Sequence, residues 1–149
     1  PNAFKRRTAY LDSMEKLGRE PELIQIDGEG WNFEEVGFLE GGKVISDGRL
    51  RTNTLLCSND RLAIGLLSAA FEAGLRVGHA DGCDLRVAGH DDHPFSRYTC
   101  PSLTTVSQDY AAIGQCSVDT IMKIIDSKEK SPEREVKLFE GRLIMRGSA

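Results

Sequence analysis

Three short polar stretches follow apolar, β-prone runs in this 149-residue sequence, and they hold most of the side chains that could bind a small molecule. They are residues 27–31, 58–60 and 90–92, and they include Asn59, Asp91 and the single tryptophan, Trp31. An amide and a carboxylate offer paired donors and acceptors for vicinal hydroxyls, and an indole face covers the apolar face of a sugar. These residue types predict a binding site for a small polyol or sugar.

Each of these residues also has a purely structural interpretation. Asn59 or Asp60 can cap the helix that follows, because both side chains accept hydrogen bonds from free backbone N–H groups. Trp31 can be a half-buried packing residue, and Asp91 with Asp92 can form a turn that begins a loop. Local sequence leaves both interpretations open at every position.

Metal binding and catalysis have less support. Residues 90–93 read His-Asp-Asp-His, with His79 and Cys83 upstream, and these residue types bind first-row metal ions. The cluster nevertheless lacks the paired spacing of zinc ligands and is followed by Pro94. The sequence has no nucleophile elbow, no zincin motif and no phosphate-binding glycine loop, since the Gly-Glu-Gly at 28–30 lacks a third glycine. We therefore expect no enzyme activity, no cofactor and no metal.

The composition is that of one soluble domain. Hydrophobic residues make up 40% of the chain, which is enough to build a core, and charged residues make up 28%. No run approaches the roughly 18 apolar residues that are needed to cross a bilayer. The first residues lack the apolar stretch of a signal peptide. The net charge is -4 with scattered basic residues, so no nucleic-acid surface is indicated. Four widely spaced cysteines indicate reduced thiols and a cytoplasmic protein.

Helices and strands that alternate along the chain would position these residues. Apolar spacing and capping residues predict four helices, at about 3–17, 33–45, 60–73 and 109–125; the three glycines in the second weaken that prediction. Short β-prone runs predict strands at 23–26, 54–57, 85–89 and 103–106, and a terminal hairpin or extended tail at 136–139 and 143–145, after a charged, solvated loop at 127–134.

Strands that alternate with helices predict βαβ units and an α/β fold with a doubly wound, mainly parallel sheet. Ligands of such sheets bind beyond the carboxyl ends of the strands, which is where the polar stretches lie.

Five blocks of the sequence resemble the effector domain of lac-repressor-like (LacI/GalR family) transcriptional regulators. The blocks are TLLCSNDRLAIG (54–65), AGLRVG (73–78), DLRVAGHDD (84–92), PSLTTVSQDY (101–110, with Gly114) and LIMRGS (143–148). They occur in the family's order and spacing over essentially the whole chain. The resemblance implies a periplasmic-binding-protein-like fold (type I) of two α/β lobes, with an effector between the lobes and an N-terminal helix-turn-helix that reads an operator.

On that scheme, residues 1–149 form the second lobe with a partial return to the first lobe at about 104–126. The DNA-binding headpiece and the first lobe would lie outside this sequence. The resemblance implies a cytoplasmic, homodimeric repressor with no membrane partner, which contacts its partner through helix 60–73 and responds to a sugar or related metabolite. The sugar-binding component of an ABC-type transporter shares the fold and is the alternative; Arg146, Ser148 and residues 103–105 favour the regulator.

Residue matching with this family implies a set of effector-binding side chains. Arg6, Asn59 and Asp91 match its hydroxyl-binding trio, Trp31 falls where some members stack an aromatic ring on the sugar, and Gln108 lies near the crossover between lobes. His90 departs from the family, which commonly has tyrosine or phenylalanine there.

The strand that would precede helix 3–17 is central in the family's sheet. We therefore expect an exposed backbone edge, resolved by strand exchange, by a dimer, or by a disrupted sheet.

Overall fold

Two short parallel strands form the centre of the structure, a computed structural model that describes residues 2–26, 31–127 and 136–149. β1 (Thr54–Leu56) pairs in parallel with β2 (Arg86–Ala88). A single parallel bridge from Ala88 to Thr104 continues this order toward β3 (Thr105–Ser107). β3 pairs antiparallel with β4 (Arg142–Ile144). The predicted mainly parallel α/β architecture is confirmed.

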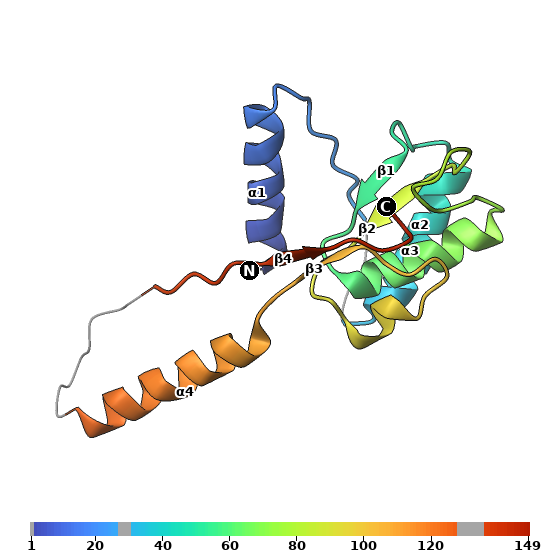
Figure 1. The fold of residues 1–149 in the computed structure, drawn as a ribbon. Helices are drawn as coiled ribbons and strands as arrows, with labels where there is room; N and C mark the ends of the chain where they lie inside the picture. Colours follow the sequence, from blue (N-terminus) through green and yellow to red (C-terminus); the bar gives the residue numbers. More distant parts are fainter. Residues whose placement is uncertain (1, 27–30, 128–135) are drawn as a thin grey trace.

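The four predicted helices are present within a few residues of their predicted bounds. They are α1 (Asn2–Lys16), α2 (Phe33–Ser46), α3 (Asp60–Glu72) and α4 (Tyr110–Asp126), and a 3-10 helix, η1 (Pro94–Arg97), lies between β2 and β3. Figure 1 shows α1 on one side of the β1–β2 pair and α2 and α3 on the other. Helices on both faces of parallel strands are what a doubly wound fold requires.

The hydrophobic core lies where α3 covers the strands. Its buried members come from α3, from β2 with the residue before it, and from the start of the β3 segment: Ala63, Leu66, Leu67, Ala70, Leu85, Val87 and Leu103. Cys57, at the end of β1, packs against this cluster. The cluster joins α3 to β2 and to the start of the β3 segment, which lie far apart in the sequence, so the turns that leave β1 and β2 begin from packed elements.

The glycines that weakened the prediction of α2 are packing positions. A Cβ atom on Gly37 would lie 2.3 Å from the carbonyl oxygen of Leu62, and one on Gly65 would lie 2.0 Å from the carbonyl oxygen of Glu34. Gly41 likewise faces Leu66 of α3. The glycines therefore allow α2 and α3 to cross at backbone contact, and tertiary packing compensates for their low helix propensity.

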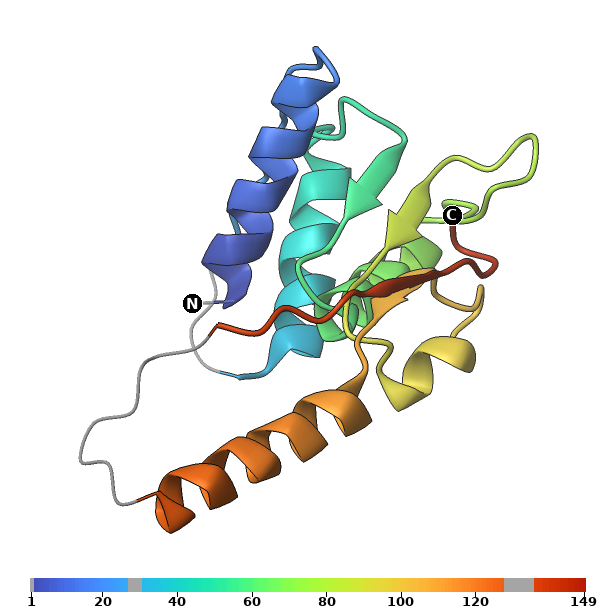
Figure 2. The ribbon, with the colours of Figure 1, turned by 60° about the vertical axis from the view of Figure 1, so that its left-hand side comes forward.

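Helix α4 projects away from the rest of the molecule in both views of the ribbon (Figures 1 and 2). None of its residues is buried. Its exposed apolar side chains are Val118, Ile121, Met122, Ile124 and Ile125. Within the described parts of the chain, no helix is both long enough and apolar enough to span a membrane.

Two predicted strands differ from the structure. Residues 23–26 have no strand conformation, because an extended segment is stabilised as a strand only by a hydrogen-bonded neighbour and the described residues supply none. The strand predicted at 103–106 begins two residues later, at Thr105, since residue 104 makes only an isolated bridge.

Of the two alternatives predicted for the C-terminal segment, a hairpin or an extended tail, the hairpin is wrong. Residues 136–139 form neither helix nor strand, and β4 pairs with β3. Residues 27–30 of the polar stretch 27–31 and nearly all of the charged loop at 127–134 lie outside the described residues.

The expected exposed edge is present at β1. Among the described residues, β1 pairs only with β2, and Leu56 is 61% exposed. The described strands form two two-stranded sheets, β1–β2 and β3–β4. Strand exchange and a dimer both involve a second chain and stay predictions.

Candidate functional site

One carboxylate oxygen of Asp91 lies within hydrogen-bond distance of three polar side chains. Its Oδ1 lies 2.5 Å from an Nη atom of Arg6 on α1 and 3.1 Å from Nε2 of Gln108 after β3. The third neighbour is Nδ1 of His90, also at 3.1 Å. Among the described residues, the other oxygen, Oδ2, has no hydrogen-bond partner and can accept from a ligand.

Arg6 links this cluster to the end of β1. Its second Nη atom donates to the backbone carbonyl of Ser58 at 2.5 Å. The next residue, Asn59, caps α3, because its Oδ1 accepts from the backbone N–H of Leu62 at 2.8 Å. The amide nitrogen of Asn59 has no partner within the described chain and can donate to a ligand. The capping and binding interpretations of Asn59 are therefore compatible.

The structure does not bring Trp31 into contact with Arg6 or Asp91. The ring is 81% exposed, which rules out the half-buried packing interpretation, and it meets Phe33 edge to face at 5.9 Å between centroids. The guanidinium carbon of Arg61, on α3, lies 5.4 Å from the centroid of the same Phe33 ring. Arg61 also donates two 2.6 Å hydrogen bonds to Glu34 of α2. Trp31 is thus held beside the N-terminal ends of α2 and α3.

The hydrogen bonds from Arg61 also affect the carboxyl group they reach. They hold the pKa of Glu34 below its usual value.

Two successive aspartates have left-handed backbone conformations at this site. The φ angle of Asp91 is 118° and that of Asp92 is 51°. Such conformations cost about 1–3 kcal/mol each in a residue other than glycine and persist only when the surroundings hold them. The strain lies at the residue whose carboxylate organises the cluster, which is where binding sites commonly keep it.

Hydrogen bonds from two side chains, Tyr110 and Arg146, hold this strained turn. The Tyr110 hydroxyl donates to the Asp91 carbonyl at 2.8 Å, and Arg146 pairs with Asp92 at 2.6 Å. Arg146 also donates to the carbonyl of Leu103 at 2.8 Å. Burial, and then the negative charge of Asp91, raise the pKa of Tyr110, so its hydroxyl stays protonated as a donor.

Asp60 is the supporting residue that sequence reasoning missed, since it was considered only as a possible helix cap. Its side chain is fully buried and accepts hydrogen bonds from Ser96 Oγ at 2.6 Å, Thr105 Oγ1 at 2.5 Å and the backbone N–H of His93 at 2.8 Å. Its own N–H donates to the His90 carbonyl at 2.9 Å. One signal in the sequence could have indicated this role: a helix has a single N-cap residue, so if Asn59 is the cap, the side chain of Asp60 must have another function.

The cluster forms an open rim. Two surface hollows of the structure lie elsewhere, one lined by residues 22–24 with Gly48, Arg49 and Arg51, and one between α2 and α3. In the parts of the chain that are described, no three His, Cys, Asp or Glu side chains are grouped to hold a metal ion. The rim offers a carboxylate oxygen, two amides and a guanidinium, which suit a neutral ligand rich in hydroxyl or N–H groups.

Comparisons with known proteins agree with this architecture. The family described as "Periplasmic binding protein-like domain" matches residues 1–149. The lactose operon repressor of Escherichia coli (strain K12) is 38% identical over 88 residues, which are 59% of this chain and 23% of that protein. The HTH-type transcriptional repressor PurR of Pasteurella multocida (strain Pm70) is 34% identical over 148 residues, which are 98% of this chain and 41% of that protein.

A solved structure extends the likeness to three dimensions. The lac repressor dimer bound to operator and the anti-inducer ONPF superposes with a TM-score of 0.81 at 27% identity, and the match covers 99% of this chain and 48% of that chain. The match therefore covers less than half the length of each of these three relatives.

Proposed function

Because this chain belongs to the periplasmic-binding-protein-like domain family, in the form found in LacI-type repressors, we propose that it is one lobe of a ligand-sensing domain in a transcriptional regulator. The lobe would bind a small sugar or related metabolite against a first lobe that the given sequence does not include. The observation that carries the proposal is the Asp91 carboxylate, held by Arg6 and Gln108 from distant elements while its second oxygen remains available. A rim of this kind binds one face of a ligand and leaves the other for a second lobe.

The proposed mechanism is a shift between two arrangements of the lobes. A ligand shifts such an equilibrium only by its difference in affinity for the two states. Arg6, Asn59 and Asp91 would therefore contact the ligand better in one arrangement than in the other. Operator DNA would be bound by a separate headpiece, and the chain itself would be a sensor in the cytoplasm with reduced cysteines and without catalytic activity.

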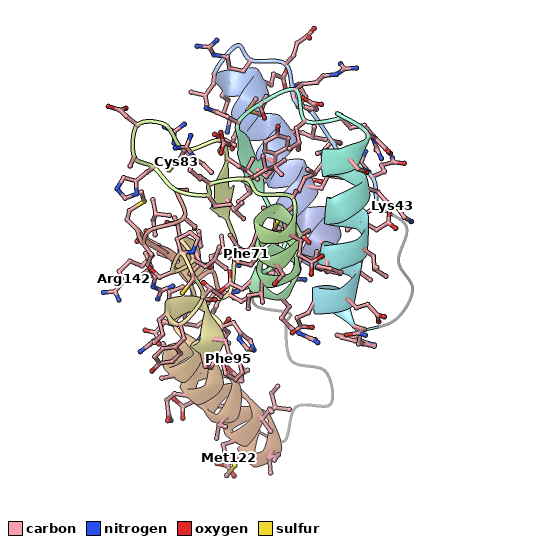
Figure 3. The ribbon with its side chains drawn as sticks, turned by 90° about the vertical axis from the view of Figure 1, so that its right-hand side faces the viewer. Lys43, Phe71, Cys83, Phe95, Met122 and Arg142 are labelled. Atoms are coloured by element: carbon pink, nitrogen blue, oxygen red, sulfur yellow. The ribbon has the colours of Figure 1, made fainter. Side chains whose placement is uncertain are left out.

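A second copy of the regulator is the proposed protein partner. Helix α3 buries Ala63, Leu67 and Ala70 in the core, yet Phe71 at its end is 80% exposed. Phe95 of η1 is 66% exposed as well, and Figure 3 labels both phenylalanines, Phe71 on α3 and Phe95 on η1. An exposed aromatic side chain on a helix that also covers the core fits the expectation that one face of α3 serves the core and another serves a homodimer.

Thermal-shift measurements on the full-length protein test the sensing proposal. The probes are D-glucose, D-galactose, D-ribose, maltose, hypoxanthine and guanine. A ligand present at 100 times its dissociation constant stabilises the folded protein by about 2.7 kcal/mol. We expect at least one sugar to raise the unfolding temperature; a protein that none of these ligands stabilises would contradict the proposal.

The variant Asp91→Ala tests the site. We expect it to lose the ligand-induced shift and the response of operator binding to ligand, because the organising carboxylate is gone, while operator binding itself remains. Asp119→Ala is the matched control, since Asp119 on α4 accepts a hydrogen bond from its helical neighbour Gln115 and is not part of the Asp91 cluster. A shift that survives in Asp91→Ala would show that the ligand binds elsewhere.

A further inference from the structure

His90 contributes a ring nitrogen to the cluster around Asp91. Its Nδ1 lies 3.1 Å from Oδ1 of Asp91, which the Arg6 guanidinium contacts at 2.5 Å. A carboxylate in contact with a guanidinium is ionised and can only accept hydrogen bonds. An unprotonated Nδ1 would direct its lone pair at that negative oxygen, so the hydrogen must be on Nδ1.

Gln108 does not favour the opposite arrangement. Its Nε2 lies 3.5 Å from Nδ1 of His90 but 3.1 Å from Oδ1 of Asp91. The shorter approach, to the charged acceptor, is the hydrogen bond, and 3.5 Å is at the limit of what counts as one. Gln108 and His90 are therefore two donors that converge on the same carboxylate oxygen.

The second ring nitrogen is then fixed as an acceptor. In a neutral imidazole one nitrogen donates and the other accepts. Within the described chain, Nε2 of His90 has no hydrogen-bond partner, and the side chain is 27% exposed. The neutral residue therefore keeps an acceptor nitrogen that has no partner among the described residues.

We propose that Asp91 holds His90 in its Nδ1–H tautomer and that His90 is a specificity-determining residue, whose Nε2 accepts a hydrogen bond from a hydroxyl or N–H group of the ligand. This rests on the proposed function, because it assigns a group to the same rim. An aromatic hydrocarbon ring at this position would supply apolar contact only. The imidazole instead selects ligands with a donor at that place and rejects those without one.

His93 provides an internal reference with the opposite arrangement. Its Nδ1 accepts a hydrogen bond from the backbone N–H of Phe95 at 3.3 Å, which requires the hydrogen to be on Nε2. His79 is exposed in the loop before β2 and serves as an unconstrained reference. The structure therefore assigns different tautomers to two histidines three residues apart.

Nitrogen-15 NMR of histidine-labelled full-length protein tests the assignment without any ligand. At about pH 8.5, where free imidazole is neutral, we expect a protonated Nδ1 in His90 and a protonated Nε2 in His93. Asp91→Ala should remove the bias in His90 and leave His93 unchanged, and Asp119→Ala should change neither. A wild-type His90 with its hydrogen on Nε2 would overturn the proposal.

A second measurement tests specificity in the protein with both lobes. The probes are whichever of the six compounds above stabilises the wild type, together with analogues that lack one hydroxyl or carry N-methyl in place of N–H. His90→Phe should weaken the parent ligand by up to about tenfold, the effect of one hydrogen bond. One analogue should bind the wild type and His90→Phe equally.

Equal weakening of every analogue, or of none, would overturn the specificity role. The two proposals fail differently. If no probe stabilises the wild type, the sensing function fails, whereas the tautomer is still decided by the NMR measurement.

Discussion

Asp60, which follows β1, and Asp91, which follows β2, are both aspartates, but their surroundings give them different roles. Asp60 is buried, accepts hydrogen bonds from hydroxyl and backbone donors and has no cationic partner among the described residues, so its role is structural. Asp91 is one third exposed and has a free oxygen, so it can serve a ligand. The buried residue fixes the segment that carries the exposed one, through the carbonyl of His90 and the N–H of His93.

Replacing the buried carboxylate should be costly. Asp60→Ala leaves the donors of Ser96, Thr105 and His93 without an acceptor, and each buried unsatisfied donor costs about 1–3 kcal/mol. We expect a loss of about 3 kcal/mol or more, measured by urea unfolding. Asp84→Ala is the control, because Asp84 is exposed and, among the described residues, accepts hydrogen bonds from Arg76 alone. Equal unfolding midpoints for both variants would mean that the hydrogen bonds of Asp60 do not stabilise the fold as argued.

The thiol of Cys57 should be unreactive in the folded protein. Burial, assisted by the charge of Asp60, raises the pKa of Cys57 from 9.0 to about 12. At about pH 8 almost no thiolate forms, and thiolate is the reactive species. We expect iodoacetamide to alkylate the exposed Cys100 and spare Cys57 until urea is added, as read by mass spectrometry. Rapid labelling of Cys57 in the native protein would contradict its place against the core.

The same pKa shift has a consequence for stability. The folded state holds the Cys57 proton more tightly than the unfolded state, so its contribution to stability is present below about pH 9 and is lost as the pH rises toward about 12.

At the scale of elements, the α2–α3 contact is the structural unit on which the site depends. The contact places the first turn of α2 against Arg61. It also supports the start of α3, where Asn59 and Asp60 lie. Its closeness comes from missing side chains at Gly37 and Gly65. A side chain at either position would force the two backbones apart, and the α3 N-terminus would move with them.

Two alanine substitutions in this pair of helices should have opposite effects. Gly65→Ala would place a Cβ 2.0 Å from a backbone oxygen of α2, which overpacks the contact and should cost about 1–3 kcal/mol or more. Gly42→Ala, in α2, meets nothing within 4 Å and should stabilise by up to about 1 kcal/mol, because alanine has the higher helix propensity. Differential scanning calorimetry measures both. A neutral Gly65→Ala would show that the helices do not cross this closely.

At the scale of the whole molecule, two features lack the partners that their chemistry calls for. β1 has a single described strand neighbour, and α4 carries an apolar face with no buried residue. Both suit a chain that is completed by a further lobe, which is the arrangement proposed above.

The isolated 149-residue chain should therefore self-associate. Exposed strand edges and contiguous apolar patches promote association in water. Light scattering after size exclusion should show a mass that rises with concentration. Ile121→Glu with Ile125→Glu on α4 should reduce the association, whereas Asp119→Asn, a polar exchange on the same helix, should not. A concentration-independent monomer would indicate that these surfaces are covered by other means.

The helices, the α/β class and the family could all be predicted from the sequence, because apolar periodicity, capping residues and ordered motifs are local properties of the chain. It also singled out Arg6, Asn59, Asp91 and Gln108, which the structure links into one rim directly or through Ser58, although their binding role remains a prediction. Strand identity at 23–26 was out of reach of local reasoning, since a strand exists only with a neighbour.

Properties that depend on contacts between distant segments could be read only from the folded chain. The buried role of Asp60, the packing role of the glycines in α2 and the tautomer of His90 all follow from atoms that lie far apart in the sequence. Burial and hydrogen-bond partnership arise only when the chain folds back on itself. A residue's type limits what it can do, and its neighbours in space decide which of those things it does.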